Sequence, residues 1–526
     1  MNKKGRFTFL AVVFIISSGF FFYLLSSCHE TGKNSHPGIS DASIQKGKKL
    51  ASLYCSSCHL LPDPGQLDKK SWETGVLPAM GPRLGIFGYL DQNYPSNRYD
   101  GFVSRSFYPS KPILEPGEWK NILDYYISMA PDSLEGQKRN ASLRTGLKLF
   151  TVAIPNSRYQ NPVTGFAAID TSMPEHRIVI TDISKKALYR FNPDLRLIDS
   201  ISTKTQVVGI DFQPHEMTLC NIGILNPNNG KYGTAEHIRI DGHGKMHLDS
   251  PALFNDLARP VQITSVDFNQ DGKKDFLVCE FGNLNGALCW MENQGDGKFR
   301  RHLLRPSPGA IKAWVQDYNH DGLPDIWVLF AQGDEGIFLF TNKGGGRFEQ
   351  QEVLRFPPMY GSSYFELADF NRDGFPDIVY TCGDNADYSR VLKPYHGVYI
   401  FINDGKNHFK QQYFFPINGC YKAVARDFDG DGDLDIAAIS FFADYARQPE
   451  EGFVYLENKG NLEFQPYTVP ETQQGRWLTM DVADLDGDGR PDIILGNFSI
   501  APAMIKSKYN WKQGPPFIVL KNTGNK

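Results

Sequence analysis

After its first few residues the sequence has no long run of lysine or arginine, and its formal net charge is −4 with a pI near 6.3. Such a chain has no strong positive field to draw in a nucleic acid, so nucleic-acid partners are excluded. At 526 residues, 22% of them charged and 41% hydrophobic, the chain is expected to fold throughout into two or more domains.

Histidine is scarce, and the 12 histidines are scattered along the chain. A copper cluster would need many histidines that converge on one site. The sequence also has no tryptophan-centred docking repeat of the kind found in quinoprotein dehydrogenases. The sequence therefore offers few candidate ligands for either of these redox cofactors. The histidines of the C-terminal part include His215, His237, His302, His320 and His396.

An apolar run of 17 residues, 9–25, follows Lys3, Lys4 and Arg6. Positive charge followed by an apolar stretch is the order of an export signal, so we expect the chain to leave the cytoplasm. The alternative is an uncleaved membrane anchor, although 17 residues are at the short limit for a spanning helix.

The run ends in "LSSC", residues 25–28, which resembles the lipobox of bacterial lipoproteins. The resemblance implies a signal peptide over residues 1–27 and a lipid on Cys28. Residues 28–40 are polar and rich in Gly, Ser, Asn and Pro, which predicts a flexible tether. We expect an extracytoplasmic protein held by its lipid on a bacterial membrane, the outer membrane in our interpretation.

The chain has eight cysteines, of which five lie after residue 200. Five is an odd number, so they cannot all pair. Cys279 and Cys289 flank a predicted hairpin and could form a disulfide in an oxidising compartment. The alternative is that all five are small buried hydrophobic residues.

The segment "LYCSSCHL" contains a Cys-x-x-Cys-His motif, Cys55, Cys58 and His59, directly after a predicted amphipathic helix, "SIQKGKKLASLY". The motif is typical of covalent haem c, in which two thioether bonds hold the porphyrin and the histidine binds the iron. A zinc site would need a second ligand pair, and none occurs within the next hundred residues. We therefore predict one haem c.

Two methionines are candidates for the sixth iron ligand. Met129 lies beside the apolar stripe of a predicted helix and is interpreted as core, whereas Met80 follows a proline in a stretch expected to be irregular. Residues 41–135 resemble class I cytochromes c. That resemblance implies a small all-α domain in which His59 and Met80 bind the iron, and a haem with both axial sites filled transfers electrons without binding substrate.

After a linker at 136–147, residues 148–526 contain a repeat that begins with phrases such as "DFNRDGFPDI", five times at spacings of 50 to 58 residues. Short apolar runs between Gly and Asn predict about four strands per repeat, which is typical of a propeller blade. Weaker copies begin at Asp170 and Asp211, so we predict an all-β seven-bladed propeller. Residues 149–154 copy the end of a blade and are expected to close the ring by pairing with the C-terminal strands.

Each full repeat has the pattern D-x-[DN]-x-D-G-x-x-D, whose alternating oxygen side chains and glycine suit Ca²⁺ in a structural role. A solvated acidic turn is the alternative. The repeats resemble the integrin-alpha-type (FG-GAP or VCBS) repeats, and up to five calcium ions are expected. The predicted ligands are Asp267, Asn269, Asp271, Asp275, Asp317, Asn319, Asp321, Asp325, Asp369, Asn371, Asp373, Asp377, Asp427, Asp429, Asp431, Asp435, Asp484, Asp486, Asp488 and Asp492.

Three functions fit these features. The first is a haem c electron-transfer protein whose propeller binds a redox partner protein, a small molecule or a glycan. The others are a propeller oxidoreductase with a second cofactor and a surface adhesion or scaffold protein.

The predicted links between strands two and three are long in blades five to seven, and Ala-Asp-Tyr recurs in blades five and six. We predict a partner site at Asp387, Tyr388, Asp444 and Tyr445 on the face opposite the acidic loops. The alternative is that these tyrosines pack the long links.

Overall fold

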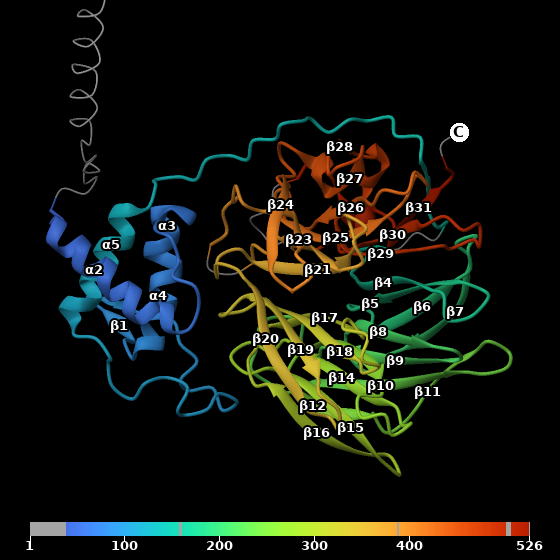
Figure 1. Cartoon of the computed structure of the whole chain (residues 1–526), viewed down its shortest axis with the longest axis horizontal. Coiled ribbons are helices and arrows are strands. Elements are labelled where there is room, and N and C mark those ends of the chain that lie inside the picture. Colours follow the sequence, from blue (N-terminus) through green and yellow to red (C-terminus); the bar gives the residue numbers. More distant parts are fainter. Residues whose placement is uncertain (1–37, 157–159, 387–388, 501–506, 525–526) are drawn as a thin grey trace, which may run out of the picture.

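The computed structural model describes residues 38–156, 160–386, 389–500 and 507–524 (Figure 1). The apolar run, the lipobox and Cys28 lie outside these ranges. Within them, every helix is too short or too polar to cross a bilayer. The N-terminal part is a small helical domain, and an extended segment joins it to a much larger all-β domain.

The helical domain is built on the crossing of α2 and α5. At the crossing α2 contributes Gly47, and a Cβ placed there would lie 1.9 Å from the backbone oxygen of Asn121 in α5, so only glycine allows so close an approach. A short hairpin, β1 and β2, accompanies the helices. The elements are α2 (Asp41–Tyr54), η1 (Cys55–Ser57), η2 (Pro64–Gln66), α3 (Lys69–Ser71), η3 (Trp72–Val76), α4 (Leu77–Met80), η4 (Gly81–Leu84), β1 (Gly88–Tyr89), β2 (Gln92–Asn93) and α5 (Pro116–Met129).

Two expectations for this domain are wrong. Met129 is 56% exposed at the end of α5, so it is not a core residue. The stretch around Met80 is not irregular either, because α3, η3, α4 and η4 follow one another without a break. Met80 is the last residue of α4, directly before Gly81 and Pro82 in η4.

The large domain is a propeller of seven antiparallel sheets, as predicted. Blade two carries an additional strand, β12 (Phe254–Leu257), which pairs with β10. The blades are β4 (Thr164–Asp170), β5 (Arg177–Asp182), β6 (Ala187–Phe191), β7 (Leu197–Ser202); β8 (Val207–Gln213), β9 (Glu216–Asn221), β10 (Gly233–Ile240), β11 (Met246–Leu248); β13 (Pro260–Val266), β14 (Asp275–Glu280), β15 (Ala287–Gly295), β16 (Lys298–Arg305); β17 (Ala310–Gln316), β18 (Asp325–Phe330), β19 (Gly336–Asn342), β20 (Phe348–Arg355); β21 (Ser362–Ala368), β22 (Asp377–Cys382), β23 (Gly397–Asn403), β24 (Phe409–Pro416); β25 (Cys420–Arg426), β26 (Asp435–Ser440), β27 (Phe453–Asn458), β28 (Phe464–Tyr467); and β29 (Trp477–Ala483), β30 (Asp492–Asn497), β31 (Phe517–Asn522) with β3 (Phe150–Ala153).

The first strands of the blades form a ring around the propeller axis. Each contacts the first strand of the next blade, and β29 of blade seven contacts β4 of blade one, which completes the circle. The second strands of blades three to seven are buried at every residue, as their continuous apolar runs predict. The core therefore lies between successive blades.

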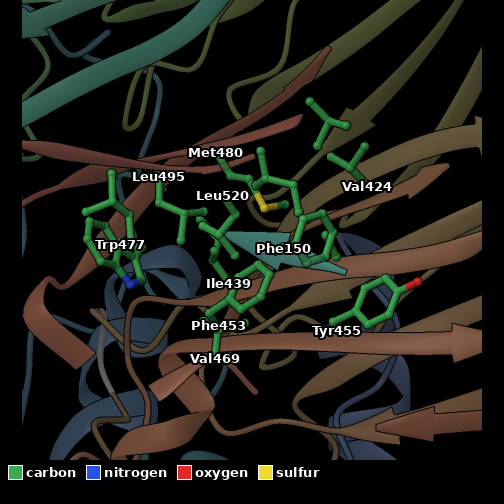
Figure 2. Close-up of a cluster of buried hydrophobic side chains, with 14 of the residues drawn as sticks. Phe150, Val424, Ile439, Phe453, Tyr455, Val469, Trp477, Met480, Leu495 and Leu520 are labelled. Carbon is green, nitrogen blue, oxygen red and sulfur yellow. The ribbon is translucent and has the colours of Figure 1, made fainter. Parts of the chain in front are cut away.

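The ring closes as predicted, because β3 is the outer strand of blade seven. Phe150 pairs with Asn522 and Ala153 with Val519 in an antiparallel register. Figure 2 shows Phe150 inside a cluster of buried side chains from blades six and seven. Its ring meets those of Phe428 and Tyr455 edge-on at centroid distances of 5.7 and 5.6 Å. The closing strand thus contributes packing as well as hydrogen bonds.

The possible disulfide between Cys279 and Cys289 does not form. The seven described cysteines are all free thiols. Cys279 is paired with Leu288, and Cys289 with Val278, so the two side chains point to opposite faces of the sheet. The five cysteines of the propeller are buried, as the alternative interpretation predicts.

Replacing Phe150 by Ala is expected to destabilise the propeller by about 3–5 kcal/mol, because a large buried side chain is lost from the closing strand. Thr151 lies exposed on the same strand, so Thr151→Ala is the matched control and should change stability by less than about 0.5 kcal/mol. Chemical denaturation measures both variants, and hydrogen exchange should show lost protection at 517–522 in Phe150→Ala alone. Equal effects of the two variants would contradict a closing role for Phe150.

Candidate functional site

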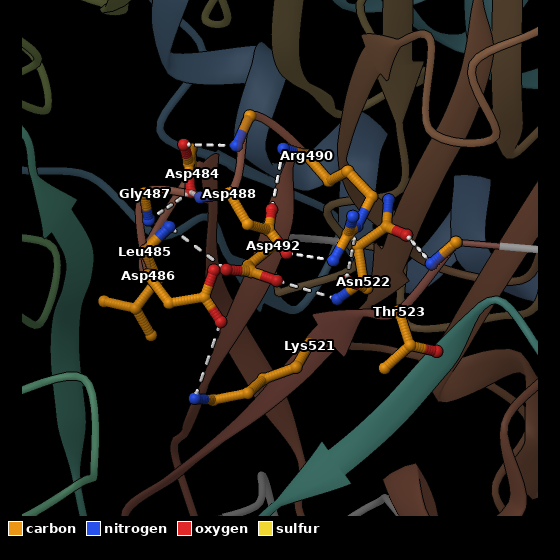
Figure 3. Close-up of polar contacts among 12 residues, drawn as sticks. Asp484, Leu485, Asp486, Gly487, Asp488, Arg490, Asp492, Lys521, Asn522 and Thr523 are labelled. Atoms are coloured by element: carbon orange, nitrogen blue, oxygen red, sulfur yellow. Dashed lines mark hydrogen bonds and ion pairs between the residues drawn. The ribbon is translucent and has the colours of Figure 1, made fainter.

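The five acidic loops share one backbone form. Each joins the first and second strands of its blade, and its glycine has a positive φ, between 78° and 94°. The N–H of that glycine donates to the first aspartate of the loop; in blade seven Gly489 donates to Asp484 at 2.9 Å. Gly487 and Asp488 also donate to Asp484 (Figure 3). The carboxylate of the first aspartate therefore stabilises the turn by accepting several backbone N–H groups of its own loop.

The last aspartate of each loop is the first residue of the second strand. In blade seven its two oxygens accept N–H groups from opposite sides, Leu485 at 3.0 Å and Asn522 at 2.7 Å (Figure 3). Burial raises the pKa of Asp492 to about 6 and that of Asp435, the equivalent residue in blade six, to about 7. A buried carboxylate of this kind is stabilised as an anion by a nearby cation.

An asparagine in the third strand is the residue that sequence reasoning missed. Its backbone N–H donates to the last aspartate of the loop in blades three to seven, and its side chain extends to backbone carbonyls. In blade seven Asn522 Nδ2 donates to Phe428 O of blade six at 2.7 Å. Asn342 makes the equivalent bond to Phe268 O at 2.9 Å. The signal available in the sequence was the recurrent Asn-x-Gly at the end of the third strand, as in "MENQG" and "FTNKG". In blades four and seven this asparagine clamps its own loop to the loop of the preceding blade.

The loops of blades six and seven gather three carboxylates each. The ligand atoms of Asp484, Asp486 and Asp492 lie within 4.8 Å of one another, as do those of the equivalent residues Asp427, Asp429 and Asp435. Oxygen ligands at this spacing suit a hard cation such as Ca²⁺. In the described chain the fifth-position residues Asp431 and Asp488 are not part of these groups, contrary to expectation, and each accepts an N–H two residues further on instead.

The loops of blades three to five carry asparagine at the third position, so each offers one carboxylate fewer. Asn269 and Asn319 turn their side-chain oxygens inward, where each accepts an N–H from the fifth residue of its loop. Burial raises the pKa of the last aspartates Asp275, Asp325 and Asp377. The amide oxygens are neutral ligands, and we expect weaker cation binding here than in blades six and seven.

The Cys-x-x-Cys-His segment lies at the C-terminal end of α2. Cys58 is exposed and Cys55 is partly buried, which raises the pKa of the Cys55 thiol to about 11. The partly buried His59 has its Nδ1 2.8 Å from the backbone oxygen of Leu60. If Nδ1 carries the proton, this bond leaves Nε2 as the nitrogen available to a metal. Cys55, Leu61, Val76 and Leu84 are all partly buried and pack against the core of the helical domain.

The helical domain docks on the propeller face opposite the acidic loops. Tyr395, in the link between β22 and β23, donates from Oη to Gln66 O at 3.0 Å, a few residues after His59. Met359, from the link between blades four and five, belongs to the same buried cluster as the core of the helical domain. Sequence reasoning did not anticipate this contact.

A second docking contact lies at blades two and three. Asn229 Nδ2 donates to Asp100 Oδ2 at 2.9 Å, and the ring of Phe102 meets that of Tyr232 edge-on with centroids 5.7 Å apart. Asn285 adds a weaker bond to Phe102 O at 3.4 Å. The N-terminal domain therefore covers part of the face that was predicted to receive a partner.

The segment 136–147 lies against blades five and six. Gln137 Nε2 donates to His396 O at 2.7 Å, and Arg139 forms an ion pair with the buried Glu451. Arg144 N donates to Pro466 O at 3.0 Å, and Arg144 O accepts from Thr468 N at 2.8 Å. These bonds hold the connection between the two domains on the propeller surface.

The predicted partner residues do not form an open site in the described chain. Tyr445 is 3% exposed, donates from Oη to Ser440 O at 2.7 Å and packs edge-on against Trp511. This is the arrangement that the packing alternative predicts. Asp444 has 12% of its side chain exposed. Asp387 and Tyr388 lie outside the described residues.

The propeller has detectable relatives. The sequence profile of the FG-GAP-like repeat matches residues 267–328 and 317–380. Cartilage acidic protein 1 of Xenopus tropicalis is 30% identical over 278 residues, 48% of this chain and 40% of that protein. Integrin alpha-3 of Cricetulus griseus is 23% identical over 189 residues, 33% of this chain and 17% of that protein. The chain therefore carries FG-GAP-like repeats in a seven-bladed propeller and spans less than half of these relatives.

Among solved structures, virginiamycin B lyase from Staphylococcus aureus is similar at 14% identity with a TM-score of 0.43. The match covers 70% of this chain and 98% of that chain. This likeness is too slight to bear on function.

Asp486→Asn is expected to weaken calcium binding without harming the metal-free fold. Among the described residues its side chain makes one ion pair, with Lys521 at 3.9 Å. Burial, and to a lesser degree the charge of Asp486, raises the pKa of Asp492, so removal of that charge relieves electrostatic repulsion in the loop. At about 1 mM calcium each intact site should add roughly 0.4–1.4 kcal/mol, from affinities of about 0.1–1 mM. Melting with calcium and with a chelator measures the difference. Asp296→Asn, in an exposed turn, is the control, and a calcium response equal to wild type in Asp486→Asn would refute the site.

Asn522→Ala should destabilise the protein by about 1–3 kcal/mol even in a chelator, because the buried oxygen of Phe428 loses its donor. Asn255 is exposed in β12, so Asn255→Ala serves as the control and should have little effect. Denaturation in the metal-free state checks both. A loss for Asn522→Ala that appears only with calcium present would show that the asparagine acts through the ion and not as a clamp.

Proposed function

We propose that the protein is a membrane-anchored, extracytoplasmic haem c electron-transfer protein whose calcium-stabilised propeller is a binding module. The observation that carries the proposal is the Cys-x-x-Cys-His segment at the end of α2. There two free thiols stand next to a histidine whose Nδ1 contacts a backbone oxygen.

The residues present fit a haem. Cys55 and Cys58 would hold the porphyrin by thioether bonds, and His59 and Met80 would fill the two axial positions. Leu61, Val76 and Leu84 offer apolar surface that a porphyrin would cover. When bound, the haem supplies one-electron redox chemistry. The chain's own part is to fix the histidine by its bond to Leu60 and to position the haem domain on the propeller through Tyr395.

The propeller supports the binding half of the proposal. Its repeats resemble those of integrin alpha chains and cartilage acidic protein 1, and its links between strands two and three are long in blades five to seven. Long links on a rigid scaffold are common recognition sites. The partner would be a redox protein, or a small molecule or glycan, and calcium would act as a structural ion.

The location rests on the N-terminal sequence. The charged and apolar segment before "LSSC" supports export, and a lipid on Cys28 would hold the protein on a bacterial membrane, in our proposal the outer membrane. The similarity to integrin alpha chains agrees with a place outside the cytoplasm.

The similarity to integrin alpha chains also favours a second candidate, a surface adhesion or scaffold protein to which the helical domain is attached. The two candidates differ in what the purified protein contains. An inventory of cofactors and metals separates them: one covalent haem with calcium supports electron transfer, whereas calcium without haem, after expression with a haem-attachment system, supports adhesion. A further redox cofactor would instead support an oxidoreductase.

Met80→Ala should abolish the methionine–iron charge-transfer band in the visible spectrum while leaving the haem attached, because the cysteines hold it independently. Met129→Ala is the matched control. Met129 is 56% exposed, so its loss should leave both spectrum and stability unchanged. Loss of the band in Met129→Ala alone would overturn the ligand assignment, and the absence of covalent haem from the wild-type protein would overturn the proposed function.

A further inference from the structure

Charged side chains from three blades and a tyrosine from a fourth meet at the propeller axis. Lys312 on β17, Lys422 on β25 and Asp481 on β29 come from blades four, six and seven, and all three lie on first strands, which surround the axis. Tyr364, on β21 of blade five, lies between the two lysines. Side chains of blades that are not neighbours can approach only where the first strands converge.

Both ammonium groups face the same aromatic ring. Lys422 Nζ lies 4.7 Å and Lys312 Nζ 5.9 Å from the centroid of the Tyr364 ring. Lys312 Nζ also lies 4.0 Å from the ring centroid of Trp314, whose Nε1 is fixed by Phe365 O at 2.9 Å. Two aromatic faces thus hold the lysines by cation–π contacts.

Lys312 contacts aromatic rings but has no oxygen partner among the described residues. Among the described residues no hydrogen bond or ion pair engages its Nζ, whereas Lys422 Nζ donates to Met480 O at 2.7 Å. Both lysines remain partly exposed, so water has access to them. Burial, followed by the nearby charge of Lys422, lowers the pKa of Lys312 to about 8. An ammonium without an acceptor in such a place has capacity for an anion.

The acidic residues nearby are already engaged. Glu366 accepts from Arg426 NH1 and from Ala425 N, both at 2.8 Å. Asp481 Oδ2 accepts from Ile169 N at 3.0 Å. The pair of Glu366 and Arg426 is neutral, so among the charged groups that act on Lys312 and Lys422 only Asp481 remains to oppose the two lysines.

We propose that the propeller axis is a binding site for a small oxyanion, a carboxylate or a phosphate, held between Lys312 and Lys422 against the faces of Trp314 and Tyr364. The anion provides the acceptor that Lys312 lacks, and the ion pair is formed where little bulk water competes. The two rings favour a flat or compact molecule. The site is independent of the haem motif and of the acidic loops.

The test uses the full-length protein with its calcium, and two probes distinguish the sources of the anion. Succinate represents carboxylates, and sulfate represents phosphate because it has a similar shape and charge and stays soluble with calcium. Each is titrated while the melting temperature is followed. At least one probe should raise the melting temperature saturably. The probe with the larger effect shows whether the site prefers carboxylates or phosphate.

Lys312→Met and Lys422→Met keep much of the side-chain volume and remove the charge. Each substitution should lower the protein's affinity for the effective probe by at least about tenfold, the range expected for loss of a charged hydrogen bond. Lys410→Met is the matched control, since Lys410 is exposed on the outer strand β24, and it should bind the probe as wild type does. An unchanged affinity in Lys312→Met would overturn the proposal.

Reductive methylation of the wild-type protein, read by peptide mass spectrometry, gives a second measurement that does not depend on how the variants fold. The bound probe should slow labelling of Lys312 and Lys422 and leave Lys410 unaffected. If neither probe protects the two lysines and neither gives a saturable shift, the axis is not an oxyanion site.

Discussion

The pairing of β3 with β31 is the constraint on which the rest of the molecule depends. It turns a row of seven sheets into a closed ring and completes blade seven as a four-stranded sheet. It also connects the two domains, because β3 follows directly on the segment 136–147 that leads from the helical domain. The helical domain is thus fixed to the propeller through the closing strand and through its contacts with Tyr395 in blade five and Asn229 in blade two.

The acidic loops also depend on contacts within and between blades. A loop with three carboxylates would repel itself, yet its lead and last aspartates are surrounded by backbone N–H groups, and the asparagine clamp ties the loop to the preceding blade. In blades four and seven this bond places the loop against the loop of the preceding blade. A cation at this place stabilises the ring as well as the turn that binds it.

Much of this architecture follows from local patterns. Five repeats in one register predicted the blades, the ring and its closure, because each copy constrains the others. The errors came where no repeat exists: Met129 lies next to an apolar stripe but on the exposed side of α5, and Pro78 and Gly81 suggested a loop where short helical turns succeed one another. The bond from Tyr395 to Gln66 joins residues 329 positions apart and has no local pattern at all.

The position of the closing strand also determines when the fold can be completed. Residues 150–153 leave the ribosome early, but their partners at 519–522 come last. At typical synthesis rates the intervening chain takes about 20 to 75 s to make. During that time Phe150 and the edge of β3 have no native partner, while the helical domain is already whole. The N-terminal strand is therefore exposed to competing pairings for the entire growth of the propeller, and its short length of four residues limits how well it can make them.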